Sequence, residues 1–150
     1  MQTINSLSEF HRLLSIPPPA HPLISVVSVS EIHAVNSDLW MQFSTDFYTI
    51  SIKNNIQSKV KYGQQYYDFA KGTMIFTAPK QVQSIEVDKT NAFNETIGTG
   101  YVLIFHTDFL KKHPLQSIIK KYGFFSYAVN EALHLSEQEE KNVVEIFQKI

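Results

Sequence analysis

The stretch that decides the fold is QYYDFAKGTMIFTAPKQVQSI, residues 65–85. It contains two short runs rich in aromatic and β-branched residues, separated from their neighbours by turn residues. Gly72 precedes the apolar run Thr73–Thr77, and the sequence Ala78-Pro79-Lys80 follows it. Proline restricts the backbone and cannot donate to a strand ladder, so a turn is expected there. Closely spaced short strands with no helix between them predict antiparallel pairing.

Runs of the same kind fill the chain on both sides, from residue 23 to residue 106. Their number and spacing predict an antiparallel sandwich or barrel and make a parallel βαβ fold not credible. The expected strands are LISVVSV (23–29), DFYTISIK (46–53), IQSKVKY (56–62), QQYYDF (64–69), TMIFTAP (73–79), QVQSIEV (81–87) and TGYVLIF (99–105).

Helical patterns flank this β region. Ser6 and Glu9 have the spacing of a capping box and predict a short first helix, which the proline-rich residues 17–22 cannot continue. We expect those prolines to form an extended connector lying against the body of the domain. After residue 106 the apolar period becomes helical, and Ser136 with Glu139 predicts the start of a last helix. The predicted organisation is therefore 1–22 helix and connector, 23–106 β-barrel and 107–150 helices.

Composition excludes several classes of protein. A chain of 150 residues is the size of one globular domain. The absence of cysteine excludes disulfides and cysteine-bound metals. A net charge of −1, with Arg12 as the single arginine, argues against direct binding of DNA. With no signal peptide and no apolar stretch of membrane-spanning length, we expect a cytoplasmic protein without membrane contact.

The residues that could carry catalysis lack the required spacing. No two of the histidines stand at the i, i+2 or i, i+4 separations that direct two imidazoles at one metal ion. The six are His11, His21, His33, His106, His113 and His134. No nucleophile motif and no glycine-rich phosphate loop occurs. We therefore expect no catalytic residue, no metal and no cofactor.

Aromatic residues of the β region give a clearer signal. Alternation places Tyr48, Phe76 and Tyr101 on defined faces of their strands. If those faces point inward, these three rings line a cavity with Trp40 at its mouth, as small antiparallel barrels that hold a ligand do. The alternative is a fully packed interior, because both arrangements need apolar side chains pointing inward.

Two stretches resemble known families. The turn closing on Gly72, the strand after it and the sequence Ala78-Pro79-Lys80-Gln81-Val82 resemble the repeating unit of the cupin, or double-stranded β-helix, barrel. The segment GYVLIFHTDFLKKHPL, residues 100–115, and the segment YGFFSYAVNEALHLSEQEEKNVVEIFQKI, residues 122–150, resemble the N-terminal sensor domains of AraC-type bacterial transcriptional regulators, in the Bacteroidetes form.

The resemblance implies a mainly β, cupin-like jelly-roll barrel with a short N-terminal helix and C-terminal helices. The HxH pair, glutamate and later histidine of cupin metalloenzymes are absent around Gly72 and Pro79. The resemblance therefore implies a sensor of a small-molecule effector that forms a homodimer and contacts DNA only through a helix-turn-helix domain missing from this chain. The alternatives are a metal-free cupin-fold sugar isomerase or epimerase and an interaction scaffold that senses nothing.

The last helix is the expected dimerisation surface. One side of it carries an apolar stripe, and the opposite side is polar. The stripe residues are Val143, Val144, Phe147 and Ile150. The pattern contains no stop signal, so we expect the helix to continue toward a further domain. The alternative is that the stripe lies back on its own barrel.

Overall fold

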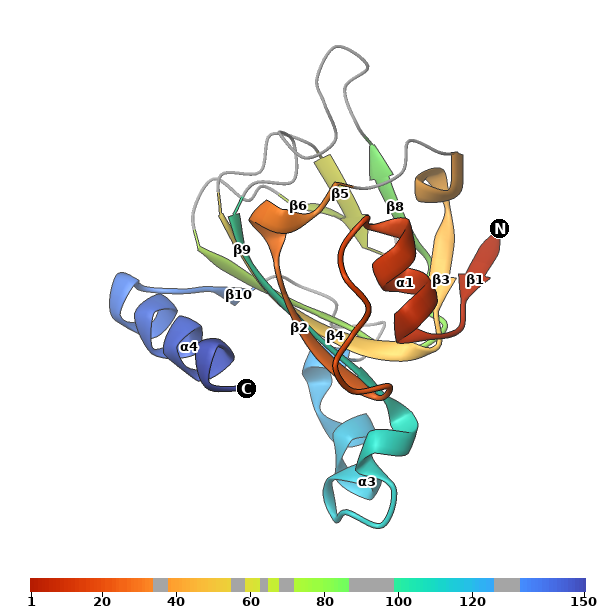
Figure 1. The fold of residues 1–150 in the computed structure, drawn as a ribbon. Helices are drawn as coiled ribbons and strands as arrows, with labels where there is room; N and C mark the ends of the chain where they lie inside the picture. The colour runs from red at the N-terminus through yellow and green to blue at the C-terminus, as the bar shows by residue number, and fades with distance from the viewer. Residues whose placement is uncertain (34–37, 55–58, 63–64, 68–71, 87–98, 126–132) are drawn as a thin grey trace.

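The structure is a computed structural model that describes residues 1–33, 38–54, 59–62, 65–67, 72–86, 99–125 and 133–150. Its described strands form two sheets, accompanied by three α-helices and several single turns of 3-10 helix (Figure 1). The content is thus mixed α and β, rather than mainly β as predicted.

The better-packed sheet has the strand order β10-β7-β4-β9-β2. Its central pair is antiparallel and places Tyr48 opposite Phe105 and Ile52 opposite Tyr101. The strand β7 pairs with the other side of β4, where Phe76 lies opposite Ile50. The bounds are β2 Ile24–Ser28, β4 Phe47–Asn54, β7 Thr73–Thr77, β9 Thr99–His106 and β10 Leu133–His134.

The second sheet has the order β1-β3-β8-β5-β6. The N-terminal strand β1 pairs with β3 in parallel, and β3 meets β8 through the single pair Phe43 and Gln83. The antiparallel pairs of β5 with β8 and with β6 complete it. The bounds are β1 Gln2–Ile4, β3 Phe43–Thr45, β5 Lys59–Tyr62, β6 Gln65–Tyr67 and β8 Gln83–Glu86.

The helices begin close to where the capping residues predict. Ser6 caps α1 (Leu7–Leu13), and Ser136 caps α4 (Glu137–Lys149) with the full capping box. The 3-10 helix η3 (Thr107–Leu110) is capped by the His106 side chain. The short helix α3 (Leu115–Ile118) gives way to the 3-10 turn η4 (Ile119–Lys121). The remaining turns are η1 (Val29–Glu31), η2 (Asp38–Met41) and η5 (Gly123–Phe125).

Both faces of the β10-β7-β4-β9-β2 sheet are covered. On the inner face, Phe47 and Ile104 belong to an apolar cluster shared with α1, β1 and β3. On the outer face, Tyr48 and Phe105 belong to a second cluster shared with η3 and η4. Successive residues of β4 and β9 therefore serve two different cores, as strand alternation requires. The helix α4 stands beside the same sheet, and α3 lies at its end (Figure 1).

Each expected strand has a counterpart among the described strands, with bounds that differ by a few residues, but the closed barrel is not confirmed. No pairing between described strands connects one sheet to the other. The parallel pairing of β1 with β3 was not anticipated, since a run of three residues is too short a pattern to identify a strand.

Candidate functional site

The predicted pocket residues do not share one site. Trp40 is buried in the inner cluster, where its ring meets Phe43 edge-on at 5.2 Å between centroids. Tyr48 lies on the opposite face of the sheet, stacked on Phe105 at 5.2 Å. Burial raises the pKa of the Tyr48 hydroxyl. Because the sheet separates Trp40 from Tyr48, the two rings cannot line the same cavity.

The other two predicted pocket residues contact the C-terminal segments. Phe76 meets Phe125 edge-on, with 5.4 Å between ring centroids. Tyr101 stacks on Phe147 of α4 at 6.3 Å, and its hydroxyl accepts a hydrogen bond from Gln148 Nε2 at 3.2 Å. The face that carries Tyr48, Phe76 and Tyr101 is thus the outer face of the sheet. Whether a ligand binds at any of the four predicted residues stays a prediction.

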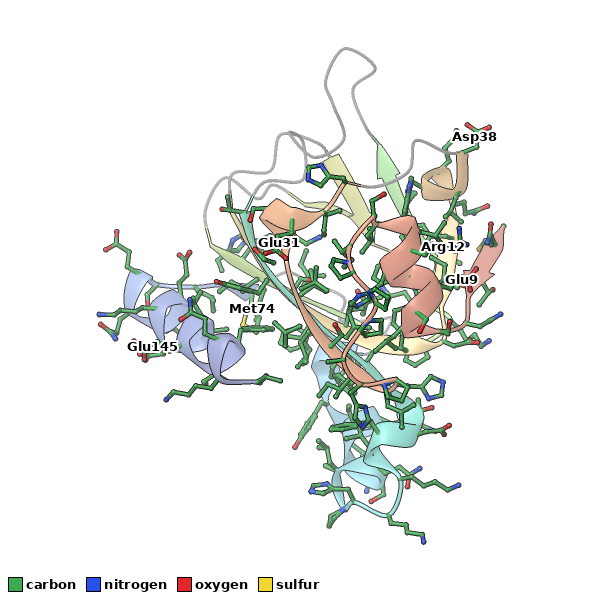
Figure 2. The ribbon with its side chains drawn as sticks, viewed as in Figure 1. Glu9, Arg12, Glu31, Asp38, Met74 and Glu145 are labelled. Carbon is green, nitrogen blue, oxygen red and sulfur yellow. The ribbon has the colours of Figure 1, made fainter. Side chains whose placement is uncertain are left out.

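The stripe predicted for dimerisation divides between two environments. Phe147 is 5% exposed and packs on Tyr101 within the same chain, whereas Ile150 is 58% exposed. Val143 and Val144 are half-buried. Figure 2 shows Met74 on the side of the sheet that faces α4 and Glu145 on the side of α4 that points away. At Phe147 the stripe therefore lies back on its own sheet, as the alternative prediction had it.

Histidine side chains support turns in this structure. The Nδ1 atoms of His21, His106 and His113 each accept a hydrogen bond from the backbone N–H two residues later, at 3.0–3.1 Å. His11 is buried, and its Nδ1 lies 2.7 Å from the Pro17 carbonyl oxygen while Nε2 lies 2.9 Å from the Ser25 hydroxyl. Among the described residues, no group of three metal-ligating side chains comes together.

Polar side chains are buried at the end of β7, in the turn after it and at the start of β8. Thr77 Oγ1, Gln81 Nε2 and Gln83 Nε2 are buried and have no hydrogen-bond partner within the described part of the chain. The Gln81 carbonyl oxygen accepts from the backbone N–H of Ala78, which fixes its amide next to the turn between β7 and β8. Buried polar groups are normally satisfied, so these atoms are available to a small polar molecule. The sequence around Pro79 indicated only that the histidine of cupin metalloenzymes is absent there, and nothing in it singled out Gln81 and Gln83 as binding residues.

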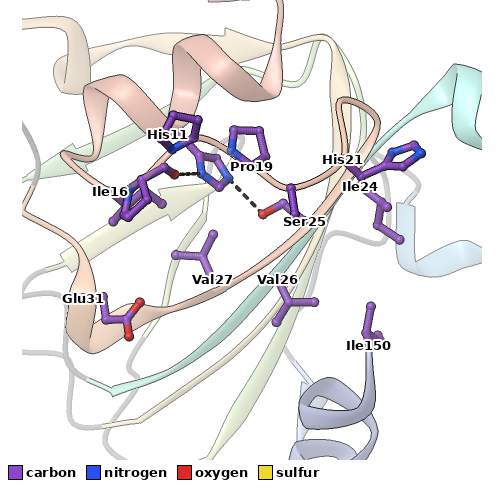
Figure 3. A pocket seen from close by; sticks show the side chains of 13 residues that line it. His11, Ile16, Pro19, His21, Ile24, Ser25, Val26, Val27, Glu31 and Ile150 are labelled. Carbon is purple, nitrogen blue, oxygen red and sulfur yellow. Dashed lines mark hydrogen bonds between the residues drawn. The ribbon is translucent and has the colours of Figure 1, made fainter.

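A groove of about 500 Å³ runs along β2 (Figure 3). One wall is the proline-rich connector, which the His11 bonds to Pro17 and Ser25 attach to β2. Glu31 and His21 stand at opposite ends, and Ile150 of the last helix reaches the rim (Figure 3). The connector was predicted to lie against the domain. The groove was missed, because its lining residues, which apart from Ile150 fall within residues 11–31, come together only when the connector folds back along β2.

The lining of this groove is mainly apolar, and its volume is in the range of small-molecule sites. Its lining residues are His11, Ile16, Pro17, Pro18, Pro19, Ala20, His21, Ile24, Ser25, Val26, Val27, Glu31 and Ile150. No described residue forms an ion pair with the Glu31 carboxylate.

No family model, curated protein or solved structure matches this chain. Within the described ranges, each helix falls short of the length and apolarity that crossing a bilayer requires.

Proposed function

We propose that this chain is the effector-sensing and dimerisation domain of an AraC-type transcriptional regulator. Its two sheets would then be the halves of a cupin-like jelly roll. The DNA-binding helix-turn-helix domain would lie outside this chain, and the intact protein would act in the cytoplasm. The sequence resemblance of residues 100–115 and 122–150 motivates this proposal, and the geometry adds an independent argument.

The observation that carries the proposal is that the two apolar clusters pack on opposite faces of one sheet, β10-β7-β4-β9-β2. Ile104 packs in the inner cluster and its neighbour Phe105 in the outer cluster with the C-terminal segments. Tyr101 on the same strand stacks on Phe147 of α4. A molecule bound on the inner face would shift β9, and α4 and η3 would follow, because close-packed interiors transmit small displacements.

The effector would bind on the inner face. Thr77 offers a hydroxyl group, and Gln81 and Gln83 offer two amide nitrogens, none of which has a hydrogen-bond partner among the described residues. None of them is ionisable, so a neutral molecule with several hydroxyl groups, such as a monosaccharide or a polyol, fits them best.

The dimer contact would involve the exposed side of α4. Phe147 is occupied within the chain, whereas Ile146 and Ile150 are 60% and 58% exposed. Two copies could bury these residues against each other around a two-fold axis. Dimerisation would place two DNA-binding domains on adjacent half-sites.

The isomerase or epimerase alternative needs two ionisable groups facing each other inside the fold. Of the described histidine, carboxylate and amine side chains, His11 is buried, and both of its ring nitrogens already have partners. No observation therefore favours that reaction class over the regulator domain.

The experiment joins this chain to a DNA-binding domain that represses a reporter gene only as a dimer. We expect repression, and we expect Ile146→Asp with Ile150→Asp to abolish it while the melting temperature is retained.

A panel of neutral monosaccharides and polyols is then screened by thermal shift, with Gln81→Leu as the variant expected to lose the response and His33→Ala as its control. A chain that is monomeric in sedimentation and that no panel member stabilises would contradict the proposal.

A further inference from the structure

The groove beside β2 contains a strand edge with which no described strand pairs. In the sheet, β2 has β9 as its neighbour and ends the strand order. The backbone N–H of His106 donates to the Leu23 carbonyl at 2.8 Å. Since antiparallel pairs alternate between hydrogen-bonded and non-hydrogen-bonded, Ser25 and Val27 point their backbone groups toward β9. The N–H and C=O groups of Ile24 and Val26 therefore point away from β9.

These free backbone groups open into the groove. Ile24 and Val26 line it, and no described residue forms a hydrogen bond with their outward N–H and C=O groups. An exposed strand edge is a template for another extended chain. The residues from Ile24 to Val27 span about 10 Å, which is the length of about three residues of an added strand.

The walls of the groove suit an extended peptide. Pro17, Pro18 and Pro19 have fixed backbone angles, so this wall loses little entropy when a ligand binds. His11 holds the wall in place through Pro17 and Ser25. The apolar surface above and below the edge would contact side chains that alternate on either side of an added strand.

The two ends of the groove differ in charge. Glu31 follows the C-terminal end of β2, and its exposed carboxylate has no ion-pair partner among the described residues. His21 stands at the other end, where its Nδ1 accepts from the Leu23 N–H. The neutral ring therefore carries its proton on Nε2, which can donate to a carboxylate. The ammonium group of a free peptide that runs antiparallel to β2 would lie at the end of the groove where Glu31 stands.

We propose that this groove binds a short, extended, apolar peptide that adds antiparallel to the free edge of β2, with its α-ammonium group at Glu31. The residue opposite Val26 donates its N–H to the Val26 carbonyl and accepts from the Val26 N–H. This site is separate from the inner face of the sheet, and the inference does not depend on the proposed regulator function.

The first experiment varies the peptide. The ¹⁵N-labelled chain is titrated with the tripeptide Val-Ala-Val, and the amide signals of Ile24 and Val26 are expected to shift. Methylating the nitrogen of the middle residue removes its donor and should weaken binding about tenfold. Acetylating the N-terminus removes the ammonium charge and should weaken binding about two- to fivefold.

The second experiment varies the protein. Glu31→Gln should weaken the free tripeptide about two- to fivefold and leave the acetylated tripeptide unaffected, because the charge pair is then absent in either case. The matched control is Glu145→Gln, a change of the same kind on the outward side of α4, which should alter neither affinity. Val26→Pro removes the outward N–H without removing a bond to β9 and should also weaken binding.

Three results would overturn the proposal. The first is a titration that leaves the Ile24 and Val26 amides unshifted. The second is equal affinity for the tripeptide and its N-methylated form, since the strand edge would then not be used. The third is a Glu31→Gln variant that affects the free and acetylated tripeptides alike. Should Val26→Pro fail to fold, the N-methylated tripeptide tests the same pairing on the unchanged protein.

Discussion

At the scale of single residues, Gly100 shows how closely β9 approaches β4. Its φ of 128° lies in a region that L side chains rarely adopt, and a Cβ there would overlap the backbone carbonyl of Ile52. Gly123 is the opposite case, because nothing lies within 4 Å of the position where its Cβ would stand. The two glycines share a residue type but not a structural requirement.

We therefore predict that Gly100→Ala destabilises the protein by at least about 2 kcal/mol, because both the backbone angle and the contact with Ile52 must change. Gly123→Ala, the matched control, should change stability by no more than about 0.5 kcal/mol. Urea denaturation measures both values. A Gly100→Ala variant as stable as Gly123→Ala would show that the two central strands are not this close.

At the scale of secondary-structure elements, α4 combines a strong local start with a tertiary contact. Its capping box has both bonds: Ser136 Oγ accepts from the Glu139 N–H at 3.2 Å, and Glu139 Oε1 accepts from the Ser136 N–H at 3.1 Å. The pKa of the Glu139 carboxyl is lowered, most by the hydrogen bond from the Ser136 backbone N–H and further by the Ser136 hydroxyl. The attachment to the sheet comes from Phe147 on Tyr101.

The capping box predicts a pH effect. Since the Glu139 pKa is lowered in the folded protein, the ionised carboxylate stabilises the helix above the ordinary glutamate value of 4.5, and this support is lost as the pH falls through the lowered pKa. Ser136→Ala removes the hydroxyl bond, so we expect the Glu139 pKa to move up toward 4.5 in an NMR titration. Ser117→Ala, which removes a hydroxyl bond to Pro114 on α3, should leave the Glu139 pKa where it is.

Attachment of α4 is tested by truncating its buried ring. Phe147→Ala should lower the free energy of unfolding by about 3 kcal/mol, because the ring loses its contact with Tyr101. Ile146→Ala, on the exposed side of the same helix, should change it by less than about 0.5 kcal/mol. Equal effects of the two substitutions at low protein concentration would mean that the chain does not bury Phe147 against its own sheet.

At the scale of the whole molecule, the two apolar clusters depend on the same strands. Trp40 reports on the inner cluster, while Leu110 packs in the outer one. Because β4 and β9 supply alternate residues to both, neither cluster can be lost without disturbing the strands that support the other.

We predict that Leu110→Ala lowers the urea midpoint measured by Trp40 fluorescence as much as the midpoint measured by far-UV circular dichroism, with a loss of about 2–4 kcal/mol. Ile118→Ala, at a position 40% exposed, is the control and should leave both midpoints nearly unchanged. Separate midpoints in Leu110→Ala would contradict a single cooperative unit, because the outer cluster would then unfold alone.

Local features of this protein follow from its sequence. Polar residues at helix starts, such as Ser6 and Ser136, bond to backbone groups three residues away, so the residues concerned are already neighbours in the chain. Strands such as Thr73–Thr77 follow from β-branched runs between turns. The absence of metal-ligand spacing among the histidines is likewise a property of the sequence alone.

Tertiary structure decided which face of each strand turns inward. Alternation separates Phe47 from Tyr48 but does not say which one lies inside, because a sheet covered on both faces carries apolar residues on both. The predicted pocket therefore gathered residues of the outer face and combined them with Trp40 from the other side. The groove beside β2 also needed the fold, since Pro17, Val26 and Ile150 meet only after α4 has docked and His11 has fixed the connector. Contacts such as these depend on tertiary packing, which no local pattern in the sequence specifies.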